Sequence, residues 1–140
     1  MGFTHALVLT AAGSSSRFSS LEKKEFSLIQ NCTVLEMALK PFLEVSNLVA
    51  VVITYKEGLL EETRKAIKNV LLPQGCDLLF VKGGQTRQES VYNGLLALEN
   101  KNIDLVSIHD GARPFVTKKL IEKCLKGALE FDGAVPGVSM

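Results

Sequence analysis

Residues 6–17 are Ala6-Leu7-Val8-Leu9-Thr10-Ala11-Ala12-Gly13-Ser14-Ser15-Ser16-Arg17, and Lys24 follows seven residues after the arginine. The first four residues form an apolar run typical of a buried strand, and the run stops at a loop of small residues. Small side chains let backbone N–H groups approach a ligand closely, and the two cations suit a polyphosphate. The same stretch also fits an ordinary strand-to-helix turn with solvated Arg17 and Lys24, so later segments must distinguish the two interpretations.

The rest of the sequence alternates apolar runs with amphipathic patterns. The apolar runs predict strands at residues 6–10, 48–54, 78–81 and 105–108, and they allow a fifth at 134–138. Helical patterns begin at Thr33 and recur over residues 59–70, 91–98 and 120–128, and Pro41 should break or kink the first helix. This alternation predicts an α/β fold with a Rossmann-like, mostly parallel sheet and helices on both faces. Ligands of such sheets bind beyond the carboxyl ends of the strands.

Composition narrows the functional class. The 140 residues are 46% hydrophobic and 6% aromatic, which suffices for one core, and the net charge of +1 argues against bulk nucleic-acid binding. Cys32, Cys76 and Cys124 are far apart, so we expect reduced, mostly buried thiols of a cytosolic protein. The first apolar run is too short to span a membrane and no Lys or Arg precedes it. We therefore expect a cytoplasmic protein with neither a membrane nor a nucleic acid as partner.

A second segment follows the strand at 78–81 and is Gly83-Gly84-Gln85-Thr86-Arg87-Gln88-Glu89-Ser90-Val91. Paired glycines permit positive φ and leave backbone groups open to a flat ligand such as a base. Ser90 lies on the first turn of the next helix, with its hydroxyl directed at the same edge of the sheet. The alternative is that Thr86 only caps this helix and Arg87 pairs with a surface acid.

A third segment, His109-Asp110-Gly111-Ala112-Arg113-Pro114, follows the strand at 105–108. Asp110 at the strand tip can hold Mg²⁺ through an oxygen. Arg113 precedes a proline, which favours an extended backbone, and it could lock this turn to the phosphate loop. In the alternative interpretation Asp110 serves the turn and His109 is a satisfied core histidine; we favour that role for His109 only. Since all three segments follow strands, we expect them to converge on one edge of the sheet.

The three motifs together are A-A-G-S-x-S-R with a following Lys, G-G-x-x-R-x-x-S-V-x-x-G-L, and H-D-x-A-R-P. In this order they resemble the 2-C-methyl-D-erythritol 4-phosphate cytidylyltransferase family of the non-mevalonate isoprenoid pathway, from Ala6 to the last residue. The resemblance implies transfer of CMP from CTP to methylerythritol phosphate, with release of pyrophosphate and with Mg²⁺ as cofactor. No nucleophilic side chain is needed for this chemistry, because positioning and fixed cations supply most of the catalysis.

The resemblance also assigns roles to individual residues. Arg17 and Lys24 would stabilise the transition state, and Asp110 would bind Mg²⁺. The residues assigned to the nucleotide are Ala11, Ala12, Gly13 and Ser14 at the phosphates, Gly84 and Ser90 at the cytosine, and Asp110 and Gly111 near the ribose.

The chain departs from the family pattern at three places. Thr10 stands where a proline is usual, and Gly111 replaces an alanine without expected harm. Lys23-Lys24-Glu25 stands where the family has P-K-Q. We assign the catalytic role to Lys24, because its spacing from Arg17 and from Phe26 matches the family, and expect Lys23 to matter little.

Members of this family extend further, with a D-T-x-K segment, a dimer-forming arm, and a Lys and an Arg that hold the substrate phosphate. We therefore expect residues 1–140 to form a single nucleotide-binding domain truncated at its C-terminus, inactive in transfer on its own, and homodimeric only where the arm is present. Two alternatives stay open: a ribitol-5-phosphate cytidylyltransferase, and a CTP-binding module without turnover. An NAD-binding domain is disfavoured because G-x-G-x-x-G is absent.

Overall fold

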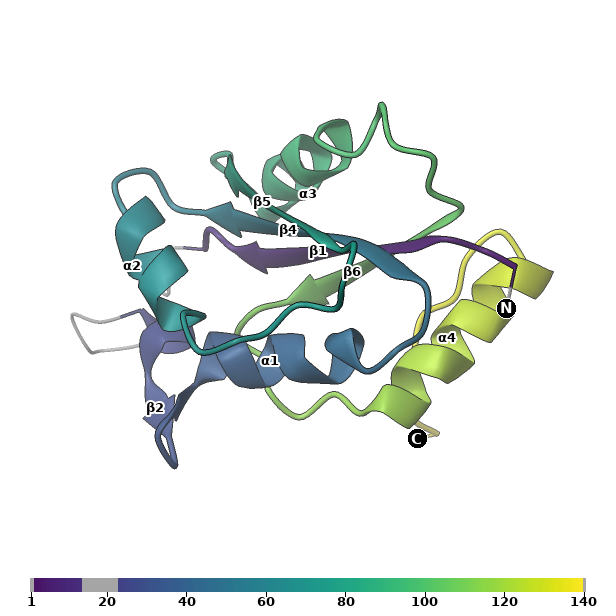
Figure 1. Cartoon of the computed structure of the whole chain (residues 1–140), viewed down its shortest axis with the longest axis horizontal. Helices are drawn as coiled ribbons and strands as arrows, with labels where there is room; N and C mark the ends of the chain where they lie inside the picture. Colours follow the sequence, from purple (N-terminus) through teal and green to yellow (C-terminus); the bar gives the residue numbers. More distant parts are fainter. Residues whose placement is uncertain (1, 14–22, 140) are drawn as a thin grey trace.

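The computed structural model describes residues 2–13 and 23–139 (Figure 1). Within them, a four-stranded parallel sheet has the order β5-β4-β1-β6, formed by β1 (His5–Ala11), β4 (Leu48–Tyr55), β5 (Asp77–Lys82) and β6 (Leu105–Asp110). The helices described are α1 (Val34–Leu43), α2 (Leu60–Ala66), α3 (Arg87–Leu96) and α4 (Lys118–Glu130). A 3-10 turn, η1 (Lys24–Phe26), leads into a small hairpin of β2 (Leu28–Ile29) and β3 (Cys32–Thr33).

The sheet is covered on both faces, which confirms the predicted fold class. In β1, Leu7 and Leu9 belong to the apolar cluster beneath α1 and α4, whereas Ala6 and Val8 face the cluster on the α3 side. Because successive side chains of a strand point to opposite faces, a strand buried on both faces is continuously apolar rather than alternating. Figure 1 shows α3 on one side of the sheet and α1 with α4 on the other.

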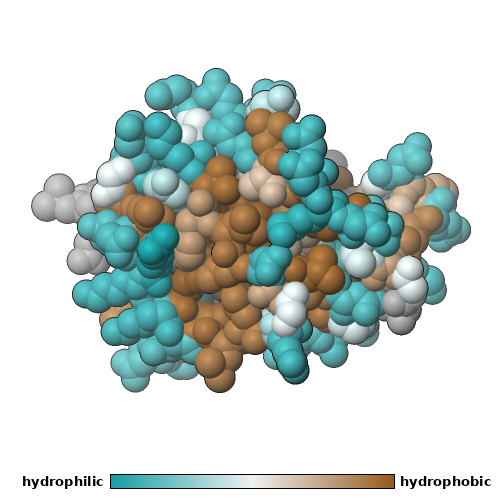
Figure 2. Space-filling view, turned by 45° about the horizontal axis from the view of Figure 1, so that its top comes forward, coloured by the Kyte–Doolittle hydropathy of each residue, from teal (hydrophilic) through white to brown (hydrophobic). Residues whose placement is uncertain are grey.

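The allowed fifth strand at residues 134–138 does not form. These residues follow α4 without pairing to the sheet, and Val135 and Val138 are 90% and 92% exposed. An apolar run becomes a strand only where a neighbouring strand supplies hydrogen bonds, and Pro136 has no N–H to give. Figure 2 shows apolar side chains also gathered in the middle of one face of the molecule, with polar side chains around them.

Two helix ends differ from the prediction in informative ways. Thr33 caps α1 as expected, since its Oγ1 accepts a hydrogen bond from Glu36 N at 3.0 Å. Pro41, however, lies inside α1, and the helix continues to Leu43 instead of breaking. Only Phe42 and Leu43 follow Pro41 in α1, so the hydrogen bond that its missing N–H removes lies in the last turn of the helix. Helix α2 ends at Ala66, and residues 67–70 continue as tight turns.

The three cysteines are free thiols, but they are partly exposed rather than mostly buried as predicted. Burial raises the pKa of the Cys76 thiol, with a smaller contribution from the neighbouring Asp77 carboxylate. In the part of the chain that the structure describes, no helix has both the length and the apolar character needed to cross a bilayer.

Candidate active site

The strand register brings the three predicted segments to one edge of the sheet. Thr10 of β1 pairs with Asp110 of β6, and Tyr55 at the end of β4 pairs with both Ala11 and Lys82. Parallel strands that end level with one another place the following residues side by side. A cavity of about 660 Å³ lies at this edge, and the predicted site residues that line it are Ala12, Gly13, Lys24, Gly84, Ser90 and Asp110.

The paired glycines allow a close approach of two loops. A Cβ at Gly83 would lie 2.2 Å from the Cβ of Ala12 and 2.8 Å from Ser90 Oγ. A Cβ at Gly84 would lie 2.3 Å from the Cβ of Glu89. Neither glycine has a positive φ, so the predicted reason for their presence was wrong. The turn needs glycine because any side chain would push the phosphate loop and α3 apart.

The N-terminal turn of α3 is held by its own side chains. Thr86 Oγ1 accepts from Glu89 N at 3.1 Å, while a Glu89 carboxylate oxygen accepts from Gln85 N at 2.7 Å. Ser90 Oγ accepts from Gly84 N at 3.0 Å and donates to Thr86 O at 3.1 Å. The sequence predicted that the backbone N–H groups of this turn would be open to a ligand. Those of residues 84 and 85 are instead hydrogen-bonded within the turn. This makes the turn a preformed wall of the cavity.

Asp110 has the turn role that the alternative interpretation gave it, and it also lies at the cavity. Its Oδ1 accepts from Ala112 N at 2.9 Å, which is a turn role, and its Oδ2 lies 3.6 Å from Arg113 Nε. The carboxylate also lines the cavity. Arg113 pairs with this acid; its predicted contact with the phosphate loop falls largely on residues 14–22, outside the described part of the chain.

His109 has the structural role that the sequence favoured. Its Nε2 lies 2.9 Å from Arg113 O, and its ring packs on buried Phe42 with 5.2 Å between the centroids. These two contacts direct the His109 side chain away from the cavity. His109 is not among the residues that line it.

Two residues assigned to the nucleotide lie behind the cavity. The Ala11 side chain is buried in the core, and Gly111 donates its N–H to Thr10 O at 2.8 Å. A Cβ at Gly111 would stand 2.8 Å from both Thr10 O and a methyl carbon of Leu35. Glycine at this position is thus more than a harmless replacement for alanine, because it lets the H-D-x-A-R-P turn pack against the end of β1.

The adjacent lysines have different environments. Lys24 is exposed and lines the cavity, whereas Lys23 is buried, hydrogen-bonded to the carbonyl of Gly13 and 3.3 Å from a carboxylate oxygen of Glu25. This difference supports the choice of Lys24 for the transition state. Ser14 and Arg17 lie outside the described residues, and their roles stay predictions.

Three further cationic side chains line the cavity, and the sequence reasoning did not assign them to the site. They are Lys56, Lys82 and Arg87. Lys56 directly follows β4 and Lys82 is the last residue of β5, so the strand-end rule used for Asp110 would have found both. Lys82 Nζ lies 3.6 Å from a carboxylate oxygen of Glu57. The cavity therefore offers positive charge from four places in the chain, which suits a polyphosphate.

Asp110 is the residue that could hold a divalent cation here. The residues described contain no cluster of three or more His, Cys, Asp or Glu that could form an all-protein metal site. Mg²⁺ is commonly bound by one or two carboxylates together with substrate phosphates and water. Glu25 and Glu57 also line the cavity, but each lies beside a lysine, Lys23 and Lys82 respectively. Asp110 beside the cations of this cavity therefore fits Mg²⁺ shared with a nucleotide.

The comparisons with known proteins agree with this geometry. The family described as 2-C-methyl-D-erythritol 4-phosphate cytidylyltransferase matches residues 5–140. The chain belongs to this family. A member from Caldanaerobacter subterraneus subsp. tengcongensis is 37% identical over 133 residues, and one from Clostridium botulinum (strain Eklund 17B / Type B) is 34% identical over 135. Each alignment covers 94% of this chain and 57% of the relative, so the chain spans little more than half the length of these family members.

Solved structures show the same fold. The 4-diphosphocytidyl-2C-methyl-D-erythritol synthase from Anaerococcus prevotii is 25% identical, with a TM-score of 0.71 over 90% of this chain and 51% of that one. A CMP:2-keto-3-deoxy-manno-octonic acid synthetase complexed with CTP is 14% identical, with a TM-score of 0.67 over 92% of this chain and 48% of that one. The second likeness concerns the fold alone.

Proposed function

We propose that the protein transfers CMP from CTP to 2-C-methyl-D-erythritol 4-phosphate with release of pyrophosphate, and that the described residues form its CTP-binding part. The observation that carries the proposal is that segments of all three family motifs meet in one cavity at the strand ends. Family membership supports the same reaction, since the matched relatives bear that name.

The phosphates of CTP would bind where β1 ends. Ala12 has a small side chain and Gly13 has none, and among the described residues nothing lies within 4 Å of a Cβ built on Gly13. Lys24, Lys56 and Lys82 line the same cavity and would offset the charge of a triphosphate. This combination of close backbone and surrounding cations is typical of a nucleotide-phosphate site.

The base would lie against the Gly83-Gly84 turn. Protein atoms fill the side-chain positions of both glycines, so the ring would lie against the face of the turn that lines the cavity. The hydrogen bonds of Ser90 hold that backbone in place. A preformed wall loses little conformational entropy when a ligand binds, so shape at this turn can contribute to the choice of base.

The reaction needs charge stabilisation more than acid–base chemistry. A phosphate oxygen of the acceptor attacks the α-phosphorus of CTP, the bond to the pyrophosphate oxygen breaks, and no proton must move. Charge builds on the equatorial oxygens, where Lys24 would stabilise it, together with Arg17 from the part of the chain that is not described. Mg²⁺, when bound at Asp110, would neutralise phosphate charge.

Location and assembly are part of the proposal. We propose that the protein acts in the cytoplasm on these small soluble substrates. A homodimer would depend on the arm of the longer family members.

Pyrophosphate release from CTP by the whole gene product tests the reaction. We expect release with methylerythritol phosphate and much less with ribitol 5-phosphate as acceptor. A preference for ribitol 5-phosphate would replace the proposed acceptor. Tight CTP binding with release from neither would leave a nucleotide-binding module.

A further inference from the structure

We propose that the buried ion pair of Lys23 and Glu25 positions the nucleotide site by tying the phosphate loop to η1, the turn that carries Lys24. The expected effect of this ion pair on CTP binding rests on the proposed function. The contact that it makes between the phosphate loop and η1 does not. Lys23 is thus a positioning residue, in contrast to the expectation from sequence that it would matter little.

The pair is buried almost completely. The side chains of Lys23 and Glu25 are 8% and 6% exposed, and Lys23 Nζ lies 3.3 Å from Glu25 Oε2. Glu25 Oε2 accepts no hydrogen bond within the described residues. A carboxylate taken out of water needs a compensating charge, and the Lys23 ammonium supplies it.

The same ammonium reaches the phosphate loop. Lys23 Nζ donates a hydrogen bond to the carbonyl of Gly13, the residue that lines the cavity beyond β1. One side chain therefore contacts two segments that are ten residues apart, the end of the β1 loop and η1. Removing it would release both contacts together.

The geometry of η1 links this pair to Lys24. Phe26 N donates to Lys23 O at 3.0 Å and Ser27 N donates to Lys24 O at 3.1 Å, which closes a tight turn. In this turn the side chains of residues 23 and 25 are buried, and the side chain of Lys24 between them is exposed at the cavity. Fixing its two neighbours limits where the Lys24 ammonium can go.

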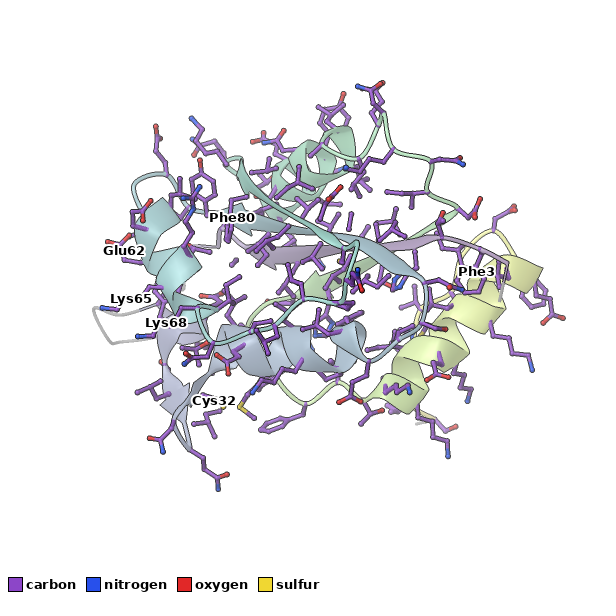
Figure 3. All side chains as sticks on the ribbon, viewed as in Figure 1. Phe3, Cys32, Glu62, Lys65, Lys68 and Phe80 are labelled. Atoms are coloured by element: carbon purple, nitrogen blue, oxygen red, sulfur yellow. The ribbon has the colours of Figure 1, made fainter. Side chains whose placement is uncertain are left out.

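The pair also controls the charge of the cavity wall. Glu25 lines the cavity in which a polyphosphate would bind, so its carboxylate alone would repel that ligand. The buried ammonium of Lys23, 3.3 Å from Glu25 Oε2, offsets the negative charge of this carboxylate. On its other side Lys23 borders a second cavity of about 960 Å³, whose rim includes Glu62, Lys65 and Lys68 (Figure 3). Each of the two cavities is thus lined by one member of the pair.

Variants that replace one or both charged side chains with uncharged ones test the proposal. We expect Lys23→Met to raise the Kd for CTP about tenfold, because it leaves Glu25 charged beside the phosphates and the Gly13 carbonyl without its donor. Adding Glu25→Gln should recover part of the affinity, to within about threefold of the original, because no buried charge is then left unpaired. The matched control is Lys118→Met, which removes an exposed lysine 3.7 Å from Glu122 and should leave the Kd unchanged.

A second measurement does not depend on CTP. In protein labelled with ¹³C at the glycine carbonyls, the Gly13 resonance should move in Lys23→Met and in the double variant but not in Lys118→Met. The double variant carries no unpaired buried charge, so it can be measured even if Lys23→Met does not fold.

The outcomes separate the two proposals. A stationary Gly13 resonance, or a moved resonance with unchanged CTP affinity in a chain that binds CTP, would overturn the positioning role. A moved resonance in a chain that binds no nucleotide would overturn the proposed function and leave the tie between the two segments standing.

Discussion

Gly83 and Ala12 come so close that a Cβ on the glycine would stand 2.2 Å from the alanine Cβ. The two residues belong to the ends of β5 and β1, which are not neighbours in the sheet, because β4 lies between them. Gly83 N also donates to Tyr55 O, at the end of β4, at 2.8 Å. The loop proposed for the base and the loop proposed for the phosphates are thus packed against each other.

Gly83→Ala should therefore damage both stability and binding. The added methyl group must displace Ala12 or Ser90, which we expect to cost about 1–3 kcal/mol of unfolding free energy. CTP affinity should fall as well, because the phosphate loop moves. Gly133→Ala is the matched control, since a Cβ there meets no described residue within 4 Å. Denaturant unfolding and calorimetry measure the two effects, and equal stability of the two variants would contradict this packing.

Ser90→Ala tests the wall of the cavity. The substitution removes the buried hydroxyl that accepts from Gly84 N and should cost about 1–3 kcal/mol in stability. A looser turn should also bind CTP more weakly and discriminate less between CTP and UTP. Ser46→Ala, at an exposed serine, should change neither property. Unaltered discrimination in Ser90→Ala would show that the turn does not read the base.

Much of the fold could be predicted because the central strands, β1 and β4, are buried on both faces and therefore continuously apolar. The runs around Leu7, Val51 and Leu79 needed no tertiary information, and the strands begin and end within a residue or two of the expected positions. The convergence of the three segments followed from the strand-end rule and is confirmed by the shared cavity. The same rule would have added Lys56 and Lys82, had it been applied to every strand.

The features that the sequence did not predict depend mainly on contacts between residues far apart in the chain. The close approach of Gly83 to Ala12 and the burial of Lys23 against Glu25 depend on how loops meet, and local patterns do not report that. The run at 134–138 has the composition of a strand, but no neighbouring strand pairs with it. The effect of Pro41 on α1 was overestimated, because the position of a proline within a helix decides how much of the helix it disrupts.

In the context of the full-length protein, Lys24→Ala should lower kcat far more than it weakens CTP binding. A cation that acts mainly on charge developing in the transition state contributes to rate, and its loss should cost about 100-fold or more. The same is expected of Arg17→Ala, whereas Lys23→Met should act through affinity. Steady-state kinetics of pyrophosphate release would show the split. A loss that lies entirely in KM would assign Lys24 to ground-state binding.

The pH dependence of stability should report His5. Burial lowers its pKa to about 4, its Nε2 lies 2.8 Å from Ser107 Oγ, and its Nδ1 has no partner in the described residues. The unfolded chain binds this proton near pH 6.5, so stability from the neutral ring is complete above that pH and declines as the pH falls toward 4. The loss should amount to about 3 kcal/mol.

His5→Gln isolates this contribution, because an amide can keep a hydrogen bond to Ser107 without titrating. The difference in unfolding free energy between the native chain and His5→Gln should change between pH 7 and pH 4. Parallel stability curves for the two proteins would show that His5 does not titrate in this window.

Calorimetric titration of the chain with CTP, UTP and ATP, each with and without Mg²⁺, tests the central claim most directly. We predict that CTP binds most tightly and that chelation of Mg²⁺ weakens its binding, because the cations, Asp110 and the Gly83-Gly84 turn share one cavity. Equal affinity for the three nucleotides, or no binding of any of them, would contradict the claim that this edge of the sheet is a CTP site.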